Sequence, residues 1–150
     1  MTDESREGII FASDHGGVAL KDSLVQFSSE LGYHPLDLGV QAQDSEDYPD
    51  IVLKAVEVFK AESVPFMVLI CGSGVGVCMA ANRFACIRAV STDNPYLARL
   101  ARQHNHANCL CMGERTIGTD LAREVLAVFL KTQEDLSQRH GRRVKKLGQL

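Results

Sequence analysis

The strongest constraint on the fold is the run of six apolar residues from Phe66 to Cys71, which ends at a glycine-rich turn. A strand with one face in water alternates apolar and polar residues, whereas a central parallel strand is buried on both faces and is apolar throughout. Shorter strand-like segments are expected at 9–12, 34–38, 87–91 and 108–112. They alternate with amphipathic stretches. This alternation predicts an α/β fold, a doubly wound (Rossmann-like) five-stranded parallel sheet with helices on both faces.

The helices are predicted from helical spacing and from capping residues. Gly32 is expected to stop a first helix, and Pro49 is expected in the first turn of a second. Asn94 and Pro95 are expected as the N-cap and first residue of a later helix. The remaining expectations are a short helix at 76–84, an inward face of Leu97, Leu100 and Ala101 after Pro95, a helix around 121–128 and a last, charged helix at 133–147.

Length and composition indicate an ordinary globular protein. The 150 residues, 45% hydrophobic and 23% charged, are expected to form a single domain spanning 1–150. The net charge of -3 disfavours a nucleic-acid or anionic-membrane partner, while the basic cluster at 139–146 suits a small anionic ligand. No apolar run approaches the roughly 18 residues of a membrane span, and the polar, acidic start is not a secretory signal. The five cysteines form no CxxC pair, which predicts reduced thiols and a cytoplasmic protein.

The glycine-rich turn after Cys71 is typical of an anion site, because backbone N–H groups between a strand and a helix can converge on negative charge. A Walker loop would need a lysine after Gly76, where Val77 stands, so a nucleotide triphosphatase is disfavoured. A dinucleotide site would need a third glycine at Val77. That interpretation stays open as a minor alternative, because Asp93 stands 21 residues after Gly72. A cysteine phosphatase would need an arginine where Val77 lies.

One cysteine, Cys71, is a candidate catalytic thiol, and two others, Cys109 and Cys111, are candidate core thiols. Cys71 is either a small buried hydrophobe at a strand end or a thiolate favoured by the helix N-terminus that follows it. The residues alone favour neither. A zinc site made of His104, His106, Cys109 and Cys111 is disfavoured, because the two cysteines alternate with apolar residues in a strand-like run.

Three further polar groups have both a structural and a functional interpretation. Asp14 and His15 can form a simple turn with an Asp N-cap and a surface histidine, or they can bind sugar hydroxyls or orient a proton carrier. His104 lies on a predicted apolar stripe and can be a packed histidine or a functional one. Arg139 and Arg143 are four residues apart, so on a helix they share a face and can grip a phosphate, or they can belong to a solvated basic face.

Eight short segments, taken together and in order, resemble the B-type ribose-5-phosphate isomerases, within the wider family that includes galactose-6-phosphate isomerase subunits. The segments are Asp14-His15-x-Gly17, Asp47-Tyr48-Pro49, Cys71-Gly-Ser-Gly-x-Gly76, Ala80-Ala81-Asn82-Arg83, Ile87-Arg88-Ala89, Arg102-Gln103-His104-Asn105, Gly113-Glu-Arg115 and Arg139-His140-x-x-Arg143-Val144. Each segment is weak evidence alone, but the ordered set is specific. The match runs from residue 8 to about 147 and leaves residues 1–7 outside.

The resemblance implies an aldose–ketose isomerase, an intramolecular oxidoreductase that interconverts ribose 5-phosphate and ribulose 5-phosphate in the pentose phosphate pathway. It implies Cys71 as the base that forms a cis-enediolate, His104 as the residue that assists ring opening, and Ser73 as a group that polarises a reacting oxygen. The substrate-binding residues that it implies are Asp14, His15, Tyr48, Gly72, Gly74, Gly76, Asn105, Arg115, Arg139 and Arg143. It implies neither a metal nor an organic cofactor.

The resemblance also implies a homodimer or homotetramer with active sites at subunit interfaces, and the helix predicted at 133–147 is expected at such an interface. Ser73 departs from the threonine of many members, but both residues supply a hydroxyl. Cys71, His104 and the arginine pair occur in one chain, which favours a homo-oligomer acting on a pentose phosphate over a two-chain galactose-6-phosphate isomerase. Two alternatives remain. They are the same chemistry on a tetrose, allose or galactose phosphate, and a non-catalytic module that binds a sugar phosphate or a nucleotide.

Overall fold

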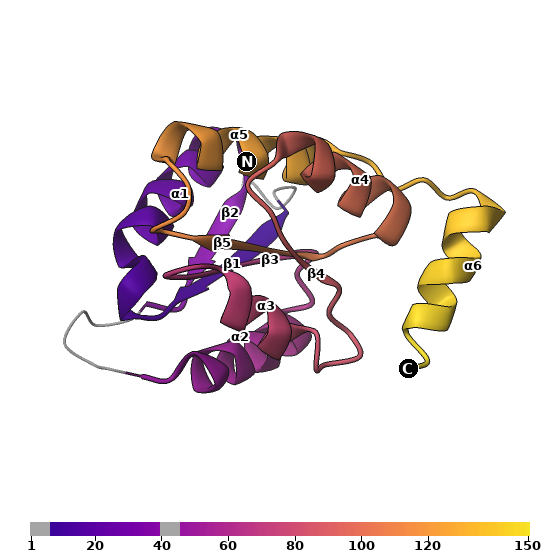
Figure 1. The fold of residues 1–150 in the computed structure, drawn as a ribbon, viewed down its shortest axis with the longest axis horizontal. Coiled ribbons are helices and arrows are strands. Elements are labelled where there is room, and N and C mark those ends of the chain that lie inside the picture. Colours follow the sequence, from indigo (N-terminus) through magenta and orange to yellow (C-terminus); the bar gives the residue numbers. More distant parts are fainter. Residues whose placement is uncertain (1–6, 40–45) are drawn as a thin grey trace, which may run out of the picture.

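The computed structural model describes residues 7–39 and 46–150, which form a parallel sheet between two layers of helices (Figure 1). Its strands are β1 (Gly8–Ser13), β2 (His34–Asp37), β3 (Phe66–Cys71), β4 (Ala89–Ser91) and β5 (Cys109–Gly113). They lie in the order β2-β1-β3-β5-β4, and every pairing is parallel. The predicted fold class is therefore confirmed. Most of the leader predicted to lie outside the match, residues 1–6, falls outside the described residues.

The two helical layers bury opposite faces of the same strands. The helices are a short 3₁₀ turn at His15–Gly17, then α1 (Val18–Glu30), α2 (Tyr48–Glu62), α3 (Val75–Ala81), α4 (Pro95–Asn105), α5 (Thr119–Lys131) and α6 (Gln138–Leu147). In β3, Val68 and Ile70 pack with α1, α4 and α5, whereas Met67, Leu69 and Cys71 pack with α2 and α3. Burial on both faces explains why this strand has no polar position. No helix within the described ranges is long and apolar enough to cross a membrane.

The predicted caps and breakers lie where the sequence places them. The Asn94 side chain accepts the N–H of Tyr96 (2.8 Å) and so caps α4, with Pro95 as the first helical residue. Gly32 follows the end of α1 with a φ of 92°, a left-handed conformation that favours glycine. Pro49 lies in the first turn of α2, where its missing N–H costs no helical hydrogen bond.

Side-chain hydrogen bonds shift two predicted boundaries. The strand expected from Ile87 begins at Ala89 instead, because the Arg88 N–H donates to the Asn108 side chain (2.8 Å) rather than to the sheet. The helix expected at 76–84 is shorter and spans Val75–Ala81. It ends there because the Asn82 side chain bonds both backbone groups of Ala89, at 3.0 and 2.8 Å.

Two predictions about the later helices were wrong. The last helix begins at Gln138 rather than at Gln133, because the preceding linker is held against α4, where the Asp135 N–H donates to the carbonyl of Gln103 (3.0 Å). Leu97 does not point inward, since it is 49% exposed. The buried positions of α4 are Ala98, Ala101 and, unexpectedly, Arg102.

A buried lysine ties α1 to β2. Lys21 is 2% exposed, and its ammonium donates to both oxygens of Asp37, at 2.8 and 2.7 Å, and to Asp22 at 2.8 Å. Burial alone would lower the pKa of this amine, but the hydrogen bonds to Asp22 and Asp37 outweigh burial and leave the pKa raised. Lys21 therefore stays charged at neutral pH, and its burial depends on these partners.

Replacing Asp37 by alanine should lower the free energy of unfolding by about 2 kcal/mol, measured by urea denaturation. A buried charge that loses its partner usually costs about 3–5 kcal/mol, but Asp37 is partly exposed and Asp22 remains. The control is Asp22→Ala, which removes a more exposed carboxylate and should cost less than about 1 kcal/mol. Equal losses in the two variants would contradict the importance given to the Lys21–Asp37 pair.

Candidate active site

Three loops meet at the carboxyl ends of β1, β3 and β5. The Asp14 N–H donates to the carbonyl of Ile70 (3.3 Å), which joins the loop after β1 to the end of β3. The N–H groups of Glu114 and Arg115 donate to the carbonyls of Cys71 (2.9 Å) and Gly72 (3.0 Å), which joins the loop after β5 to the glycine-rich turn. Loops at this edge of a parallel sheet are the usual ligand site of such folds.

Cys71 ends β3 with its thiol directed into the glycine-rich turn. The residue is 6% exposed, and its Sγ accepts the backbone N–H of Gly74 (3.1 Å). Gly74 caps α3 in the left-handed region, with φ 76°, and this conformation turns its N–H back toward the sulfur. A fixed N–H donor stabilises negative charge on sulfur, so the turn is suited to a thiolate.

The glycine-rich turn lies directly on β5, and two glycines permit this contact. A Cβ added to Gly113 would lie 2.4 Å from the carbonyl carbon of Ser73, and one added to Gly74 would lie 2.7 Å from that of Met112. No side chain larger than hydrogen fits at either position without displacing backbone. This close approach determines where the turn sits relative to the Cys71 thiol.

The polar groups of the turn have capacity left for a ligand. The Ser73 hydroxyl accepts the N–H of Val75 (3.3 Å), so its own hydrogen can be donated to a ligand oxygen. Asp14 uses Oδ1 to accept the Gly16 N–H (2.9 Å) and caps the 3₁₀ turn that carries His15. Its second carboxylate oxygen can accept a ligand hydroxyl.

The rim of this site is formed by an aromatic ring and a guanidinium. Tyr48, 41% exposed, is the first residue of α2, and a Cβ on Gly76 would meet its ring at 2.8 Å. The Arg115 guanidinium lies 3.5 Å from the position of a Cβ on Gly72. We call this group the thiol half-site. It contains Asp14, His15, Tyr48, Cys71, Gly72, Ser73, Gly74, Gly76 and Arg115.

The other four predicted site residues lie at the opposite end of the strands, where β3 and β5 begin. His104 and Asn105 end α4 just before β5, and Asn108 accepts the N–H of Met67 near the start of β3 (2.9 Å). Cys71, by contrast, pairs with Gly113 at the far end of β5. The five steps between Phe66 and Cys71 correspond to roughly 16 Å. One chain therefore does not bring His104 to Cys71.

Arg139 and Arg143 lie on α6, which stands away from the sheet beside the carboxyl end of α4 (Figure 1). With His104 and Asn105 they form what we call the histidine half-site. Both arginines are exposed, and no residue of α6 is buried. The two halves of the predicted site are thus on opposite sides of a single chain.

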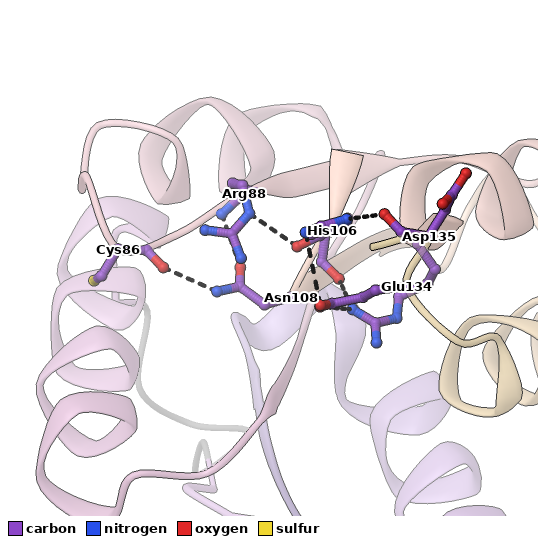
Figure 2. A network of polar contacts seen from close by, with 8 residues as sticks. Cys86, Arg88, His106, Asn108, Glu134 and Asp135 are labelled. Atoms are coloured by element: carbon purple, nitrogen blue, oxygen red, sulfur yellow. Dashed lines mark hydrogen bonds and ion pairs between the residues drawn. The ribbon is translucent and has the colours of Figure 1, made fainter. Parts of the chain in front are cut away.

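A network of polar contacts holds the linker to α6 against the carboxyl end of α4 (Figure 2). His106 Nε2 donates to the carbonyl of Asp135 (2.9 Å), and His106 Nδ1 lies 3.6 Å from Glu134 Oε2. Arg102 donates to Glu134 Oε1 (3.2 Å) and to the carbonyl of Ala107 (2.7 Å). These contacts determine where α6 begins, and hence where its two arginines lie.

The same network continues to the start of β5. Arg88 Nε donates to the carbonyl of His106 (2.8 Å), and the Asn108 amide donates to the carbonyl of Cys86 (2.9 Å) (Figure 2). Burial lowers the pKa of Arg88, while the charge of Glu134 opposes that effect. The left-handed backbone of His106, with φ 49°, ends α4 and turns the chain into this network.

Arg102 belongs to one of the matched segments of the sequence, and its role in this network was not predicted. It is 7% exposed and lies over the rings of Phe66 and Phe129, with Cζ 4.9 and 5.6 Å from their centroids. Aromatic faces and the carboxylate of Glu134 together compensate for burying the cation. Arg102 stands four residues after Ala98, on the buried side of α4, and this spacing was a signal that the arginine is buried and paired. Its partner, Glu134, is 32 residues away in sequence, so the pair itself could not be predicted.

The candidate core thiols lie in the sheet, as predicted. Cys109 and Cys111 are fully buried in β5, and their sulfurs are 3.8 Å apart. The hydrogen bond with Cys109, together with burial, raises the pKa of Cys111 well above its ordinary value. The His106 ring is engaged with Asp135 and Glu134. Among the described residues, no group of three or more His, Cys, Asp or Glu side chains could hold one.

A pocket of about 220 Å³ borders the thiol half-site on the side of β4. Ser73 and Gly113 form the boundary that the pocket shares with the glycine-rich turn, and Asp93 and Thr116 belong to its polar lining. Cys71, Asp14 and Arg115 do not line this pocket. The pocket therefore lies beside the thiol half-site and does not enclose the thiol.

Comparisons with known proteins agree with one another. A family model described as Ribose/Galactose Isomerase matches residues 9–147. The chain is 39% identical over 136 residues to ribose-5-phosphate isomerase B of Escherichia coli, covering 91% of each protein. It is 36% identical over 140 residues to a putative sugar phosphate isomerase of Bacillus subtilis, covering 93% of each.

Solved structures give the same result. The chain superposes on ribose-5-phosphate isomerase B of Clostridium thermocellum with a TM-score of 0.89 at 41% identity, covering 95% of each chain. The TM-score with the type B ribose 5-phosphate isomerase of Trypanosoma brucei is 0.91 at 34% identity, covering 96% of this chain and 98% of that one.

Replacing Gly113 by alanine should displace the glycine-rich turn from β5 and lower the free energy of unfolding by about 2–3 kcal/mol, because the added methyl would overlap the Ser73 backbone. Gly141→Ala is the control. A Cβ there meets no atom within 4 Å, and alanine should stabilise α6 by up to about 1 kcal/mol. Urea denaturation measures both. An unchanged stability for Gly113→Ala would contradict the close approach of the turn and the strand.

Proposed function

The chain belongs to the ribose/galactose isomerase family, and we propose that it interconverts ribose 5-phosphate and ribulose 5-phosphate through a cis-enediolate. Membership makes it an isomerase of the intramolecular oxidoreductase class. The observation that carries the proposal is the Cys71 thiol, which ends the central strand inside a turn whose Gly74 N–H donates to the sulfur. Nucleotide binding gives no role to a thiol at this position, and a cysteine phosphatase would need an arginine where Val77 lies.

In the proposed reaction, Cys71 is the general base. The thiolate removes the proton from C2 of the open-chain aldose, the C2–H electron pair forms the C1–C2 double bond, and the C1 carbonyl oxygen takes the negative charge. The hydroxyl proton then passes from O2 to O1, which leaves the negative charge on O2. The O2 electron pair forms the C2 carbonyl, and the electron pair of the C1–C2 double bond takes the proton back from the Cys71 thiol at C1. The oxidation of one carbon is matched by reduction of its neighbour, so the chemistry calls for no external oxidant or reductant.

The glycine-rich turn supplies donors for the charge on the enediolate. The Gly74 N–H is directed to the sulfur and the Val75 N–H to Ser73, so the donors proposed for substrate are the other turn amides and the Ser73 hydroxyl. Donors fixed before the reaction stabilise developing charge without reorganisation. Around them, the proposal assigns Asp14 and Tyr48 to sugar hydroxyls.

The substrate phosphate is assigned to positive groups of both half-sites. His15 and Arg115 border the thiol half-site, and Arg139 and Arg143 come from the histidine half-site. Arginine pairs bind phosphate oxygens with two parallel hydrogen bonds each and so determine its orientation. Binding energy at the phosphate then holds C1 and C2 against Cys71, which raises the rate of the chemical step.

We propose that the active site is composite and that a second copy of the chain completes it. Within one chain, His104 and Cys71 lie at opposite ends of β5. In a two-fold dimer, His104 of each chain can lie beside Cys71 of the other chain, which gives two equal sites. Apolar side chains on the helices that flank the edge strand β4 support a subunit contact. They are Val75 and Met79 of α3 and Tyr96 and Leu97 of α4, each about half exposed or more.

In the composite site His104 is the acid–base residue that opens the furanose ring, and Asn105 polarises the reacting oxygen. The α6 helix, whose side chains find no buried position in one chain, would then lie at the subunit interface. Reduced thiols throughout the chain and a phosphorylated sugar substrate both suit the cytoplasm. A tetrose, allose or galactose phosphate is the alternative substrate for the same chemistry.

Replacing Cys71 by alanine should lower kcat by about 100-fold or more, because the reaction loses its proton carrier. The assay follows ketopentose formation from ribose 5-phosphate, with no metal or nucleotide added. Cys86→Ala is the matched control and should keep wild-type activity, since only the backbone carbonyl of Cys86 takes part in the contacts described. Full activity of Cys71→Ala would contradict the proposal that Cys71 is the base. An inactive wild type would redirect the assay to the alternative sugar phosphates.

Mixing two inactive variants tests the composite site. Cys71→Ala and His104→Ala homodimers should each be nearly inactive. After random subunit exchange, half of the dimers are hybrids with one intact site of two, so activity should rise to about a quarter of the wild-type value. If each chain carried a complete site, the hybrids would gain nothing. Exchange of the wild type with itself controls for losses during mixing.

A further inference from the structure

We propose that His140 is a positioning residue for His104, and that it holds the His104 ring at one orientation by face-to-face stacking. The inference rests on the proposed function, because it deepens the role given there to His104. His140 was part of a matched segment, but neither the sequence nor the reaction scheme assigned it a role.

The stack joins the last turn of α4 to the first turn of α6. The ring centroids of His104 and His140 are 4.3 Å apart, and the ring planes differ by 3°. The His140 side chain is only 14% exposed, although it belongs to a helix with no buried residue. The stack is therefore a contact that orders the start of α6 against α4.

A carboxylate orients the second ring of the stack. Asp135 Oδ2 lies 3.6 Å from His140 Nε2, and Asp135 is itself held to α4 through its backbone, which donates to Gln103 (3.0 Å) and accepts from His106 (2.9 Å). The Asp135 side chain also accepts the Ser137 N–H at 2.8 Å. The contacts thus form a ring: α4 holds Asp135, Asp135 orients His140, and His140 stacks on His104 of α4.

The charges around the stack disfavour a proton on His140. His140 faces His104 from α4, Arg139 and Arg143 on its own helix, and Asp135 from the linker. Burial, then the neighbouring His104 charge, lower the pKa of His140, and the Asp135 carboxylate only partly opposes them. Two protonated imidazoles at this separation would repel each other. The lowered pKa of His140 therefore favours a neutral ring, which can stack on His104 without charge repulsion.

Stacking alone does not reveal a function, because two histidines can also pack for stability. The distinguishing property is that a positioning residue acts only through the residue that it positions. A mutational cycle with His104 therefore separates the two roles, and an aromatic replacement of His140 separates stacking from proton binding.

The first experiment measures kcat/KM with ribose 5-phosphate in the full-length oligomer. We expect His140→Leu to lower kcat/KM by about tenfold, since it frees the His104 ring, and His140→Phe to remain within about threefold of the wild type, since it keeps a stacking face. In the His104→Ala background, adding His140→Leu should change kcat/KM by less than about twofold. An undiminished tenfold effect in that background, or no effect of His140→Leu in the wild type, would overturn the proposal.

A second measurement is independent of turnover. The Cε1–H resonance of His104, identified by its loss in His104→Ala, is followed by NMR between pH 5 and 9. Its position should be shifted upfield by the His140 ring current, should move downfield in His140→Leu and should stay upfield in His140→Phe. An unchanged resonance in His140→Leu would refute the stack even if the enzyme is active. The expected shifts in a protein that does not turn over ribose 5-phosphate would leave the stack standing and overturn the proposed function alone.

Discussion

The parallel pairing of β3 with β5 is the constraint on which the candidate site depends. Because the two strands run in the same direction, the end of β3 lies beside the end of β5. The residues that precede β5 lie at the opposite end of both strands. Cys71 is fixed at one edge, and His104, which comes just before β5, is fixed at the other. Parallel strands need long crossover connections, so this separation cannot be removed by a local change. It is the physical reason for proposing that two chains share each site.

Each half of the site is held by a different kind of interaction. The thiol half-site depends on the close approach of the glycine-rich turn to β5, which the small size of Gly74 and Gly113 permits. The histidine half-site depends on polar contacts, in which Arg102, His106 and Glu134 bind the linker that leads to α6. Backbone packing thus determines where the turn lies relative to the Cys71 thiol. Side-chain contacts determine where α6 begins, and hence where Arg139 and Arg143 lie.

Much of the fold could be predicted because its signals are local. The uniform apolar run Phe66–Cys71 indicated a central strand, and Asn94 and Pro95 marked a helix start, since each effect acts within a few residues. The errors arose where a distant partner decided the outcome. The linker before α6 is not helical because it is bound to α4, and Arg102 is buried because Phe66, Phe129 and Glu134 surround it. No pattern within a short window contains those partners.

The sequence by itself determined the class of fold, the family and the list of candidate site residues, because strand periodicity, turn chemistry and ordered motifs are properties of the chain. The tertiary structure alone decided how those residues are grouped. It brought Asp14, Tyr48 and Arg115 to the Cys71 thiol through the sheet order, and it kept His104 away from them. The physical reason is that grouping depends on strand order and register, which arise from contacts between residues far apart in the chain.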